Sequence, residues 1–467
     1  MKSYVLSLLF IAIGSTAQEP VNAVISNSSL FSGTTRMPFW FVSNQNGKVK
    51  ESAYYLNLTE VTLTAPESIR ILKNLSYYAG ANVLAGIGSS NYFNVNQAYS
   101  GLGYKNWELK AGWFQNEQKY DGLSSTNGDI HWSNNIRPMP RIRLSTDYFR
   151  LFLFPDWFSV HGLYEEAWLN DKSRSVQNAR LHHKYLFFHF LLSSSSHLTA
   201  GLDHYVQWGG VHPKLGHLPS GFFDYFRYVL GQPGTEDFID SDQRNMAGSH
   251  EGKYVISYHR QFQNSSLEIY LNHPFTDRMD LSNYKDNLTG MFYKLSNRRF
   301  IEAVIYEFMY TKFQRRVLQP DGSYSAPGGG NEPYFRHGIY RSGLSYQNRM
   351  FVTPFAIPLV IIDGVNLGTG NNRIVLHHLG LSGNYSELIT WKTLLSYSNN
   401  LGTFNKAYDV VQPGFFDSAR KQISAYGEID FFIKDYKWNI KTAAAIDSGS
   451  LLENTTGFQI ALTYHLF

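Results

Sequence analysis

The last segment of the chain alternates between apolar and polar side chains. Its apolar side holds Phe458, Ile460, Leu462, Tyr464 and Leu466. A period of two predicts a β-strand with one apolar and one polar face. The segment ends on an aromatic residue, Phe467, as the chains of bacterial outer-membrane barrels usually do. The alternative is the edge strand of a soluble sandwich.

The same alternation recurs along most of the chain. In residues 140–151, Ile142 and Leu144 share one side, and Arg141 and Arg143 share the other. Residues 18–37 are expected to be irregular. Strands are predicted at 38–42, 53–64, 69–86, 92–104, 106–116, 140–151, 157–170, 184–193, 197–209, 250–263, 265–275, 287–297, 299–314, 333–346, 349–358, 372–385, 387–402, 421–433, 436–450 and 455–467. The total is about 18 to 20 strands, and bacterial barrels have even strand numbers. We expect an all-β fold, a transmembrane antiparallel β-barrel of about 18 strands.

Charged rows opposite apolar rows favour a barrel over a soluble sandwich. The polar side of a large barrel lines its lumen, whereas charge on the lipid face costs about 2–4 kcal/mol at mid-depth. Glu166 and His204 break the pattern and leave the register open there. The lumen row carries both signs of charge, which indicates a salt-bridged lining more than a selectivity filter of one sign. The predicted lumen-lining residues include Arg141, Arg143, Asp147, Glu165, Asp203 and Glu307.

Connections between the predicted strands alternate in length, which orients the barrel. Short links such as 104–106 and 194–196 are typical of periplasmic turns, and longer links are typical of outer loops. The largest outer loop is expected at 210–249. Its piece 220–231 has apolar residues at helical spacing behind Ser220, a candidate cap. We expect this loop to fold inward over the mouth, so that long outer loops occlude the lumen.

Composition points to export. Residues 1–17 are typical of a secretory signal peptide, which leaves 18–467 for the barrel. The chain has no cysteine, so disulfides and thiolate metal sites are excluded. Its net charge of +4 does not suggest a nucleic-acid partner. No mature segment approaches the ~20 apolar residues that a membrane helix needs. These features predict a protein of the bacterial outer membrane.

Few arrangements in the chain suggest catalysis or metal binding. His161 and Glu165 lie on one side of a predicted strand, as an acid–base pair would, but polar lumen residues are the simpler interpretation. The stretch 121–129 offers oxygens to calcium but lacks the spacing and closing Glu of an EF-hand. No spacing resembles a zinc site. We expect no enzyme activity, no catalytic residue, no cofactor and no metal.

Aromatic side chains beside polar groups in the outer loops are typical of carbohydrate binding. Sugar rings stack on aromatic rings, while amides, carboxylates and guanidinium groups bind the hydroxyls. Trp208 lies on the apolar face near a strand end, so a residue of the aromatic membrane belt is the alternative there. The candidates for polysaccharide binding are Tyr120, Trp132, Arg137, Trp208, His212, Tyr324 and Tyr334.

Several stretches, in order along the mature chain, resemble the capsule assembly Wzi family of outer-membrane proteins, in its Bacteroidetes-like branch. They are residues 38–47 (PFWFVSNQNG), 134–140 (NNIRPMP), 201–210 (GLDHYVQWGG), 306–308 (YEF), 334–340 (YFRHGIY) and 372–373 (NR). The resemblance implies an 18-stranded barrel occluded by its outer loops. It also implies a lectin-like role, in which secreted capsular or exopolysaccharide is held at the cell surface.

Three functional hypotheses remain from the sequence. The resemblance favours a lectin-like anchor for capsular or exopolysaccharide. The polar lumen favours the alternative, an outer-membrane diffusion channel or porin. A surface enzyme acting on lipid or glycan is the third. The expected partners are the polysaccharide, outer-membrane lipid or lipopolysaccharide (LPS), and a polysaccharide exporter, with no nucleic acid.

Overall fold

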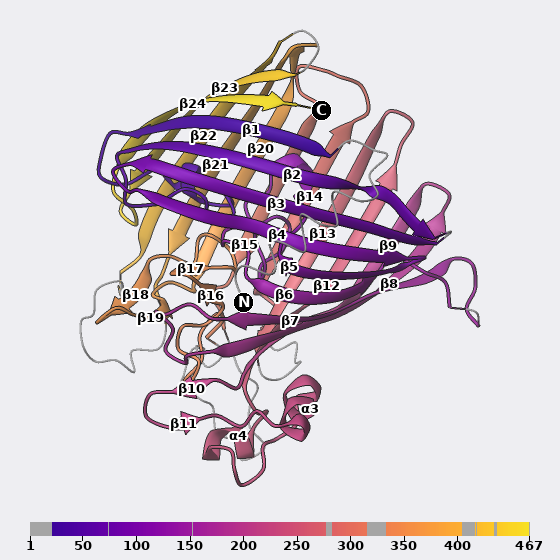
Figure 1. Ribbon diagram of the computed structural model, residues 1–467, viewed down its shortest axis with the longest axis vertical. Coiled ribbons are helices and arrows are strands. Elements are labelled where there is room, and N and C mark those ends of the chain that lie inside the picture. The colour runs from indigo at the N-terminus through magenta and orange to yellow at the C-terminus, as the bar shows by residue number, and fades with distance from the viewer. Residues whose placement is uncertain are drawn as a thin grey trace.

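The computed structural model describes residues 21–72, 74–151, 153–276, 283–314, 333–403, 416, 418–433 and 437–466. The predicted signal peptide, Tyr324 and Phe467 lie outside these residues. One antiparallel sheet of 18 strands closes on itself (Figure 1). Its strands are β1 (Asn22–Ser32), β2 (Tyr55–Leu72), β3 (Leu75–Gly88), β4 (Tyr92–Tyr104), β5 (Trp107–Trp113), β6 (Pro140–Thr146), β7 (Phe158–Leu169), β8 (Ala179–Ser193), β9 (Ser196–Trp208), β12 (Ser249–Gln261), β13 (Ser265–Thr276), β14 (Asn287–Leu295), β15 (Ala303–Tyr310), β20 (Ile374–Ser386), β21 (Ile389–Asn400), β22 (Arg420–Phe432), β23 (Trp438–Gly449) and β24 (Thr455–His465).

The first and last strands close the barrel. β1 pairs with β2 on one side and with β24 on the other, and Val24 lies opposite His465. Each of the 18 strands therefore has a hydrogen-bonded neighbour on both sides, so the sheet has no free edge, as a membrane-spanning sheet requires. The prediction of an 18-stranded antiparallel barrel is confirmed.

The two faces of the wall follow the predicted alternation. Ile142 and Leu144 point outward and are 46% and 40% exposed, whereas Arg141 and Glu165 point into the lumen and are 3% and 0% exposed. The outward row is apolar, as the lipid-facing surface of a transmembrane barrel requires. Among the described residues, no helix is long and apolar enough to cross a membrane.

Connection length distinguishes the two ends of the barrel. One end carries both described chain ends and short turns such as 105–106 and 194–195, and we identify it as the periplasmic end. The other end carries the long connections 33–54, 114–139, 170–178, 209–248 and 311–373. The last of these, rather than 210–249, is the longest connection. The reason is that 333–346 and 349–358, predicted as strands, are not part of the wall.

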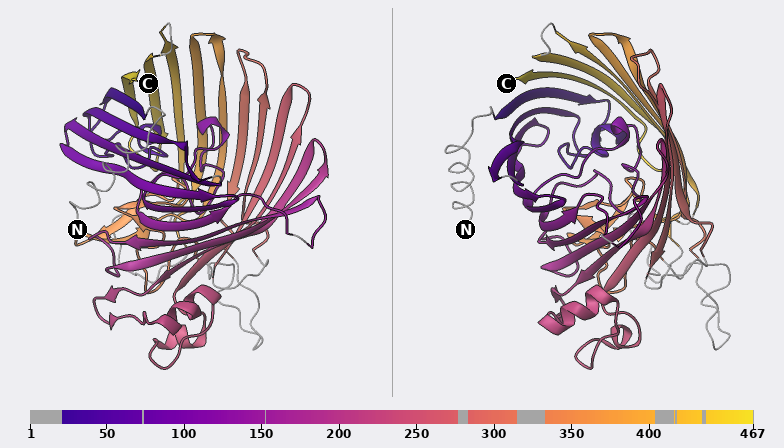
Figure 2. Two further views of the ribbon diagram at one scale, coloured as in Figure 1. Left: turned by 45° about the vertical axis from the view of Figure 1, so that its right-hand side comes forward. Right: turned by 90° about the vertical axis from the view of Figure 1, so that its right-hand side faces the viewer.

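Four of the long connections fold into the lumen and form a plug, which Figure 2 shows inside the curve of the sheet. We define the plug as residues 33–54, 114–139, 170–178, 311–314 and 333–373. Its apolar side chains, including Trp40, Trp132 and Phe351, build the main hydrophobic core together with inward residues of the wall. The plug also holds the short helix α2 (Phe39–Val42), the 3-10 turn η1 (Tyr120–Gly122) and the short strands β16 (Ser345–Tyr346), β17 (Arg349–Met350), β18 (Leu359–Ile362) and β19 (Val365–Thr369).

Two local predictions were wrong for physical reasons. Residues 38–42 were predicted as a strand, but all four residues of α2 are buried in the plug, so this apolar run has no solvent side. Residues 18–37 were predicted to be irregular, yet they contain β1. Its outward Asn27 donates to Asn57 Oδ1 at 3.0 Å and to Thr59 Oγ1 at 2.8 Å. Polar groups that bond to each other across strands hid the alternation of β1.

The connection 209–248 was predicted to fold inward, and this was wrong. It carries β10 (Val211–His212), β11 (Gly216–His217), α3 (Phe222–Leu230) and α4 (Asp240–Arg244), and α3 confirms the predicted helix at 220–231. Tyr228 of α3 packs against Val206 and Trp208 on the outward side of β9. Figures 1 and 2 show α3 and α4 outside the wall at the long-loop end.

Candidate functional site

Two cavities lie on opposite sides of the plug. The luminal chamber, of about 390 Å³, lies between the plug and the periplasmic end. The outer groove, of about 410 Å³, opens among the long loops. Among the described residues, none lines both cavities. Plug residues line both cavities: Asp129 and Trp132 face the luminal chamber, and Asn135 and Arg349 face the outer groove.

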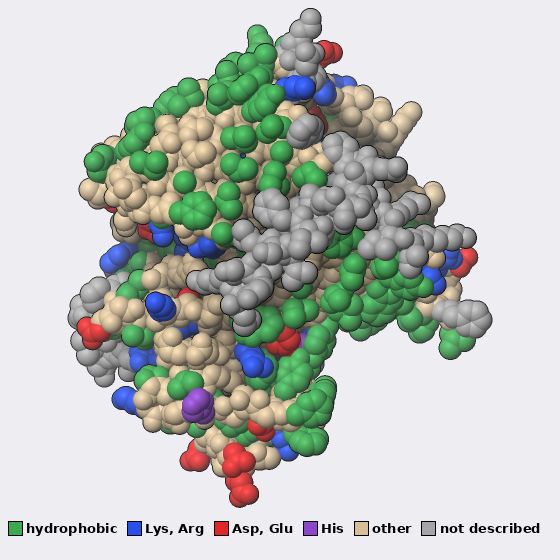
Figure 3. Space-filling model, in the orientation of Figure 1, with side chains coloured by type: hydrophobic (Ala, Val, Ile, Leu, Met, Phe, Trp, Pro, Cys, Tyr) green, Lys and Arg blue, Asp and Glu red, His purple; other side chains and the backbone are tan. Residues whose placement is uncertain are grey.

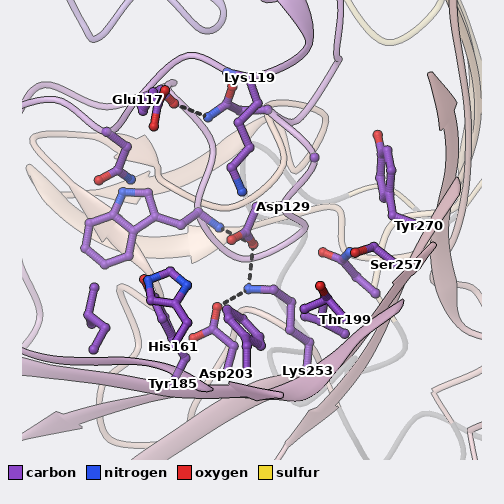
Figure 4. Close-up of a pocket in the computed structure, with 18 of the residues that line it drawn as sticks. Glu117, Lys119, Asp129, His161, Tyr185, Thr199, Asp203, Lys253, Ser257 and Tyr270 are labelled. Carbon is purple, nitrogen blue, oxygen red and sulfur yellow. Dashed lines mark hydrogen bonds and ion pairs between the residues drawn. The ribbon is translucent and has the colours of Figure 1, made fainter. Parts of the chain in front are cut away.

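An ion cluster ties the plug to the wall inside the luminal chamber (Figure 4). Lys253 Nζ of β12 lies 2.5 Å from Asp203 Oδ2 of β9 and 2.8 Å from Asp129 Oδ1 of the plug. The Tyr205 hydroxyl also donates to Asp203 Oδ2, at 3.0 Å. The plug thus contributes one of the two anions that neutralise a fully buried ammonium group.

A second ion cluster continues around the wall. Glu165 Oε2 lies 2.6 Å from Arg143 Nε, and Glu165 Oε1 lies 3.2 Å from Arg141 Nη1. His183 connects the clusters, with Nδ1 3.7 Å from Glu165 Oε1 and Nε2 2.8 Å from Asp203 Oδ1. Removing one partner from such a buried pair costs about 3–5 kcal/mol. These charges line the lumen as paired ions and hold strands together.

Glu307 of β15 holds the plug segment 114–139. Its carboxylate accepts hydrogen bonds from the Ser124 hydroxyl at 2.5 Å, the Ser125 backbone N–H at 2.7 Å and the Ser125 hydroxyl at 2.5 Å. The Tyr270 hydroxyl donates to the same carboxylate at 2.5 Å. Four donors around one fully buried carboxylate satisfy its charge without a cation.

Tyr120 and Trp132, predicted to bind polysaccharide, lie inside the barrel at the luminal chamber. Tyr120 stacks on Tyr270 with ring centroids 5.1 Å apart and donates to Glu268 Oε1 at 2.9 Å. Trp132 is only 6% exposed and packs on Phe351 with centroids 5.2 Å apart. Both side chains fix the plug in place and lie away from the outer surface.

Arg137 and Tyr334, two further candidates, also bind within the protein. Arg137 donates to Asn94 Oδ1 at 2.8 Å and to the Val95 carbonyl at 2.6 Å, which ties the plug to β4. Tyr334 is fully buried and donates to Asp286 Oδ2 at 3.0 Å. Burial raises the pKa of Asp286 to about 6. Both candidates stabilise the loops from within.

The remaining predicted residues lie apart from one another. Trp208 is the last residue of β9, at the long-loop end of the barrel. Its ring centroid lies 5.7 Å from that of Tyr228. His212 is in β10 of the outside loop, half-buried. Asp147 follows the end of β6 and is exposed at the periplasmic end, so it is not part of the inward row of β6. The sequence candidates therefore do not form one site.

His161 and Glu165 do not form the acid–base pair considered above. His161 Nε2 lies 2.9 Å from the Tyr185 hydroxyl, whereas Glu165 is bound to Arg141 and Arg143. Throughout the described part of the chain, no group of three or more His, Asp or Glu side chains is arranged to hold a metal ion.

The outer groove offers both charge and apolar surface to the outside. Arg36 Nε lies 2.7 Å from Glu51 Oε1, and both residues line the groove together with Asn348. Its apolar lining includes Pro354, Ile357, Pro358, Ile361 and Leu452. Such a surface suits a sugar chain, because the lining packs on carbohydrate C–H groups while the polar edge binds hydroxyls. Sequence reasoning missed this groove because its residues come from four distant segments with no shared motif.

The chain is similar to a known family and to solved structures. A family model described as capsule assembly protein Wzi matches residues 28–353. The Escherichia coli outer membrane protein Wzi, described as a carbohydrate-binding β-barrel involved in group 1 capsule assembly, is 13% identical, with a TM-score of 0.58 over 98% of this chain and 87% of that chain. OprD from Pseudomonas aeruginosa is 9% identical, with a TM-score of 0.50 over 96% of this chain and 94% of that chain. At these identities the likeness shows the fold alone. No curated protein sequence matches the chain.

Proposed function

The chain belongs to the capsule assembly protein Wzi family, and from this premise we propose that it binds capsular or exopolysaccharide and holds it at the cell surface. The protein lies in the outer membrane, and its outer groove is the proposed contact for the polymer. Binding is non-covalent, so no catalytic residue or cofactor takes part.

The observation that carries the proposal is the plug, whose apolar side chains form a buried core inside the barrel. A diffusion channel needs a continuous polar path, but one buried apolar core reaches both cavities: its Trp132 faces the luminal chamber and its Phe39 faces the outer groove. Buried ion pairs and hydrogen bonds hold the plug to the wall. A barrel built in this way presents a fixed surface to the outside, which supports binding over conduction.

Deleting the gene tests whether the protein holds polysaccharide at the cell surface. We expect polymer made in the normal amount but shed into the medium. If the polymer stays attached to the cells and uptake of small solutes changes, the channel hypothesis replaces the proposal.

The outer groove is tested by removing its charges. A double variant, Arg36→Gln with Glu51→Gln, keeps two hydrogen-bonding amides but loses both charged partners for sugar hydroxyls. Hydrogen bonds to charged groups contribute about 1.5–3 kcal/mol, so we expect attached polymer to fall by about tenfold.

A matched control makes the same change at the opposite end of the barrel. Arg150 and Asp156 form an exposed ion pair in the connection between β6 and β7. Arg150→Gln with Asp156→Asn is expected to retain polymer as the wild type does. If the gene deletion sheds polymer but the groove variant does not, the contact lies elsewhere on the outer surface.

A further inference from the structure

A polar cluster lies on the outward face of the wall, where lipid is expected. It contains the two residues that broke the alternation, Glu166 and His204. On neighbouring strands it also contains His182, Lys184 and His250, all on the outward side. Ionisable groups on the lipid face of a barrel are costly near mid-depth, so this cluster needs a cover.

Helix α3 and the residues that follow it supply that cover. The Tyr225 hydroxyl donates to Glu166 Oε1 at 2.6 Å, and Lys184 donates to the Val229 carbonyl. His250 Nε2 lies 2.7 Å from the Ala247 carbonyl oxygen. The inner face of α3 is thus fixed against the outer wall by polar contacts as well as by the packing of Tyr228 on Trp208.

The opposite face of α3 is apolar and exposed. Its large side chains recur at helical spacing: Phe222, Phe223, Phe226 and Leu230 are 71%, 80%, 43% and 63% exposed. Four exposed apolar side chains on a helix of nine residues form a surface that water does not favour.

This apolar face continues the lipid-facing belt of the barrel. Tyr164 and Trp168 of β7 and Leu186 of β8 are 40%, 38% and 47% exposed on the neighbouring outer wall. Figure 3 shows hydrophobic side chains running from the outer wall of the barrel down to the position of α3. Because the helix joins the surface that already faces lipid, lipid is a better occupant than a second protein.

We propose that α3 lies in the outer leaflet of the membrane, with its exposed apolar face among the acyl chains. Helices of this kind lie in the interface plane with their apolar face about 5–10 Å deep. The acidic residues that follow, including Glu236 and Asp237, are exposed and remain in water. The helix therefore anchors one side of the extracellular mouth at a fixed depth. This inference does not depend on what the outer groove binds.

Spin labels test the proposal, because the chain has no cysteine and single cysteines label cleanly. Full-length Phe223→Cys protein would be labelled with a nitroxide and reconstituted in phosphatidylcholine vesicles. Collisions with oxygen, which concentrates in lipid, and with a water-soluble nickel chelate would be measured. Leu144→Cys on the barrel wall is the lipid reference, and Asp237→Cys is the water reference.

We expect the label at Phe223→Cys to behave like that at Leu144→Cys, with oxygen collisions exceeding nickel collisions several-fold relative to Asp237→Cys. Phe222→Cys gives an independent reading on the same face. A label as accessible to nickel as that at Asp237→Cys would overturn the proposal. So would spin–spin broadening, which would indicate a second copy on this face, or protection from both reagents, which would indicate a protein partner.

Discussion

At the scale of single residues, His131 is a buried imidazole that the plug packs in its uncharged form. Its ring lies in the plug between Tyr205 and Phe335, with centroids 5.7 and 5.6 Å away. Burial, helped by the positive charge of Lys253, lowers the pKa of His131 to about 3. The side chain is therefore neutral in the folded protein at neutral pH.

His131 is expected to make the fold sensitive to acid. The unfolded side chain binds a proton below its ordinary pKa of 6.5, whereas the buried one does so only near 3. The unfolded state thus binds more protons between these values, and stability is lost as the pH falls from 6.5 toward 3. At pH 5 the loss from this residue is about 2 kcal/mol.

Urea unfolding of wild type and His131→Asn at pH 7.5 and pH 5 measures this effect. The variant is expected to lose about 2 kcal/mol less than wild type between the two pH values. The control is His217→Asn, in the outside loop where His217 is exposed, and it is expected to leave the difference unchanged. An equal acid loss in wild type and His131→Asn would contradict the argument.

At the scale of elements, the plug segment 114–139 depends on Glu307. In Glu307→Gln, an amide replaces the carboxylate that accepts four hydrogen bonds, so its NH₂ group faces donors. Leaving buried donors unsatisfied costs about 1–3 kcal/mol each. We expect this segment to detach transiently and produce brief conductance events in planar bilayers, on a silent wild-type background.

The control for that measurement is Glu268→Gln. Glu268 lies in the same lumen and accepts a hydrogen bond from the Tyr120 hydroxyl at 2.9 Å. The same substitution there disturbs that contact rather than the four hydrogen bonds that Glu307 accepts. Silent recordings from both variants would mean that Glu307 does not keep the plug closed.

Alternation predicts the wall well because it reports the immediate surroundings of each side chain. Lipid on one side and lumen on the other impose a period of two wherever a strand crosses. The plug was predicted only as occlusion by outer loops, since a segment packed inside a barrel has protein on all sides. For that reason 38–42 was predicted as a strand and is a helix.

The candidate site was less predictable, because aromatic residues serve packing as well as sugar binding. Trp132 and Tyr334 were chosen as loop aromatics, and both are buried. The outer groove depends on Arg36, Glu51 and Asn348, which only the folded plug brings together. Glu166 and His204 carried a signal that was visible in the sequence, since a polar residue on a lipid face requires a cover.

At the scale of the whole molecule, many barrels in one membrane can hold the same polymer. Single sugar contacts are weak, but linked contacts bind more tightly by a factor of about 10²–10⁴. We expect protein in vesicles to retain long polysaccharide at least about 100-fold better than detergent-solubilised monomer does. Short oligosaccharides are expected to bind both forms equally poorly. Equal retention of long and short chains by vesicles would contradict the prediction. Equal affinity of the solubilised monomer for long and short chains would not contradict it, because a monomer has no second barrel to link.

The pairing of β1 with β24 has a consequence for how the protein is made. These two strands lie at opposite ends of the chain, so the seam between them cannot form until the last strand has been synthesised and exported. Until then the growing sheet has two unpaired edges, which readily join other chains. A chain that lost its final strand would therefore be left with exposed edges for quality control to clear.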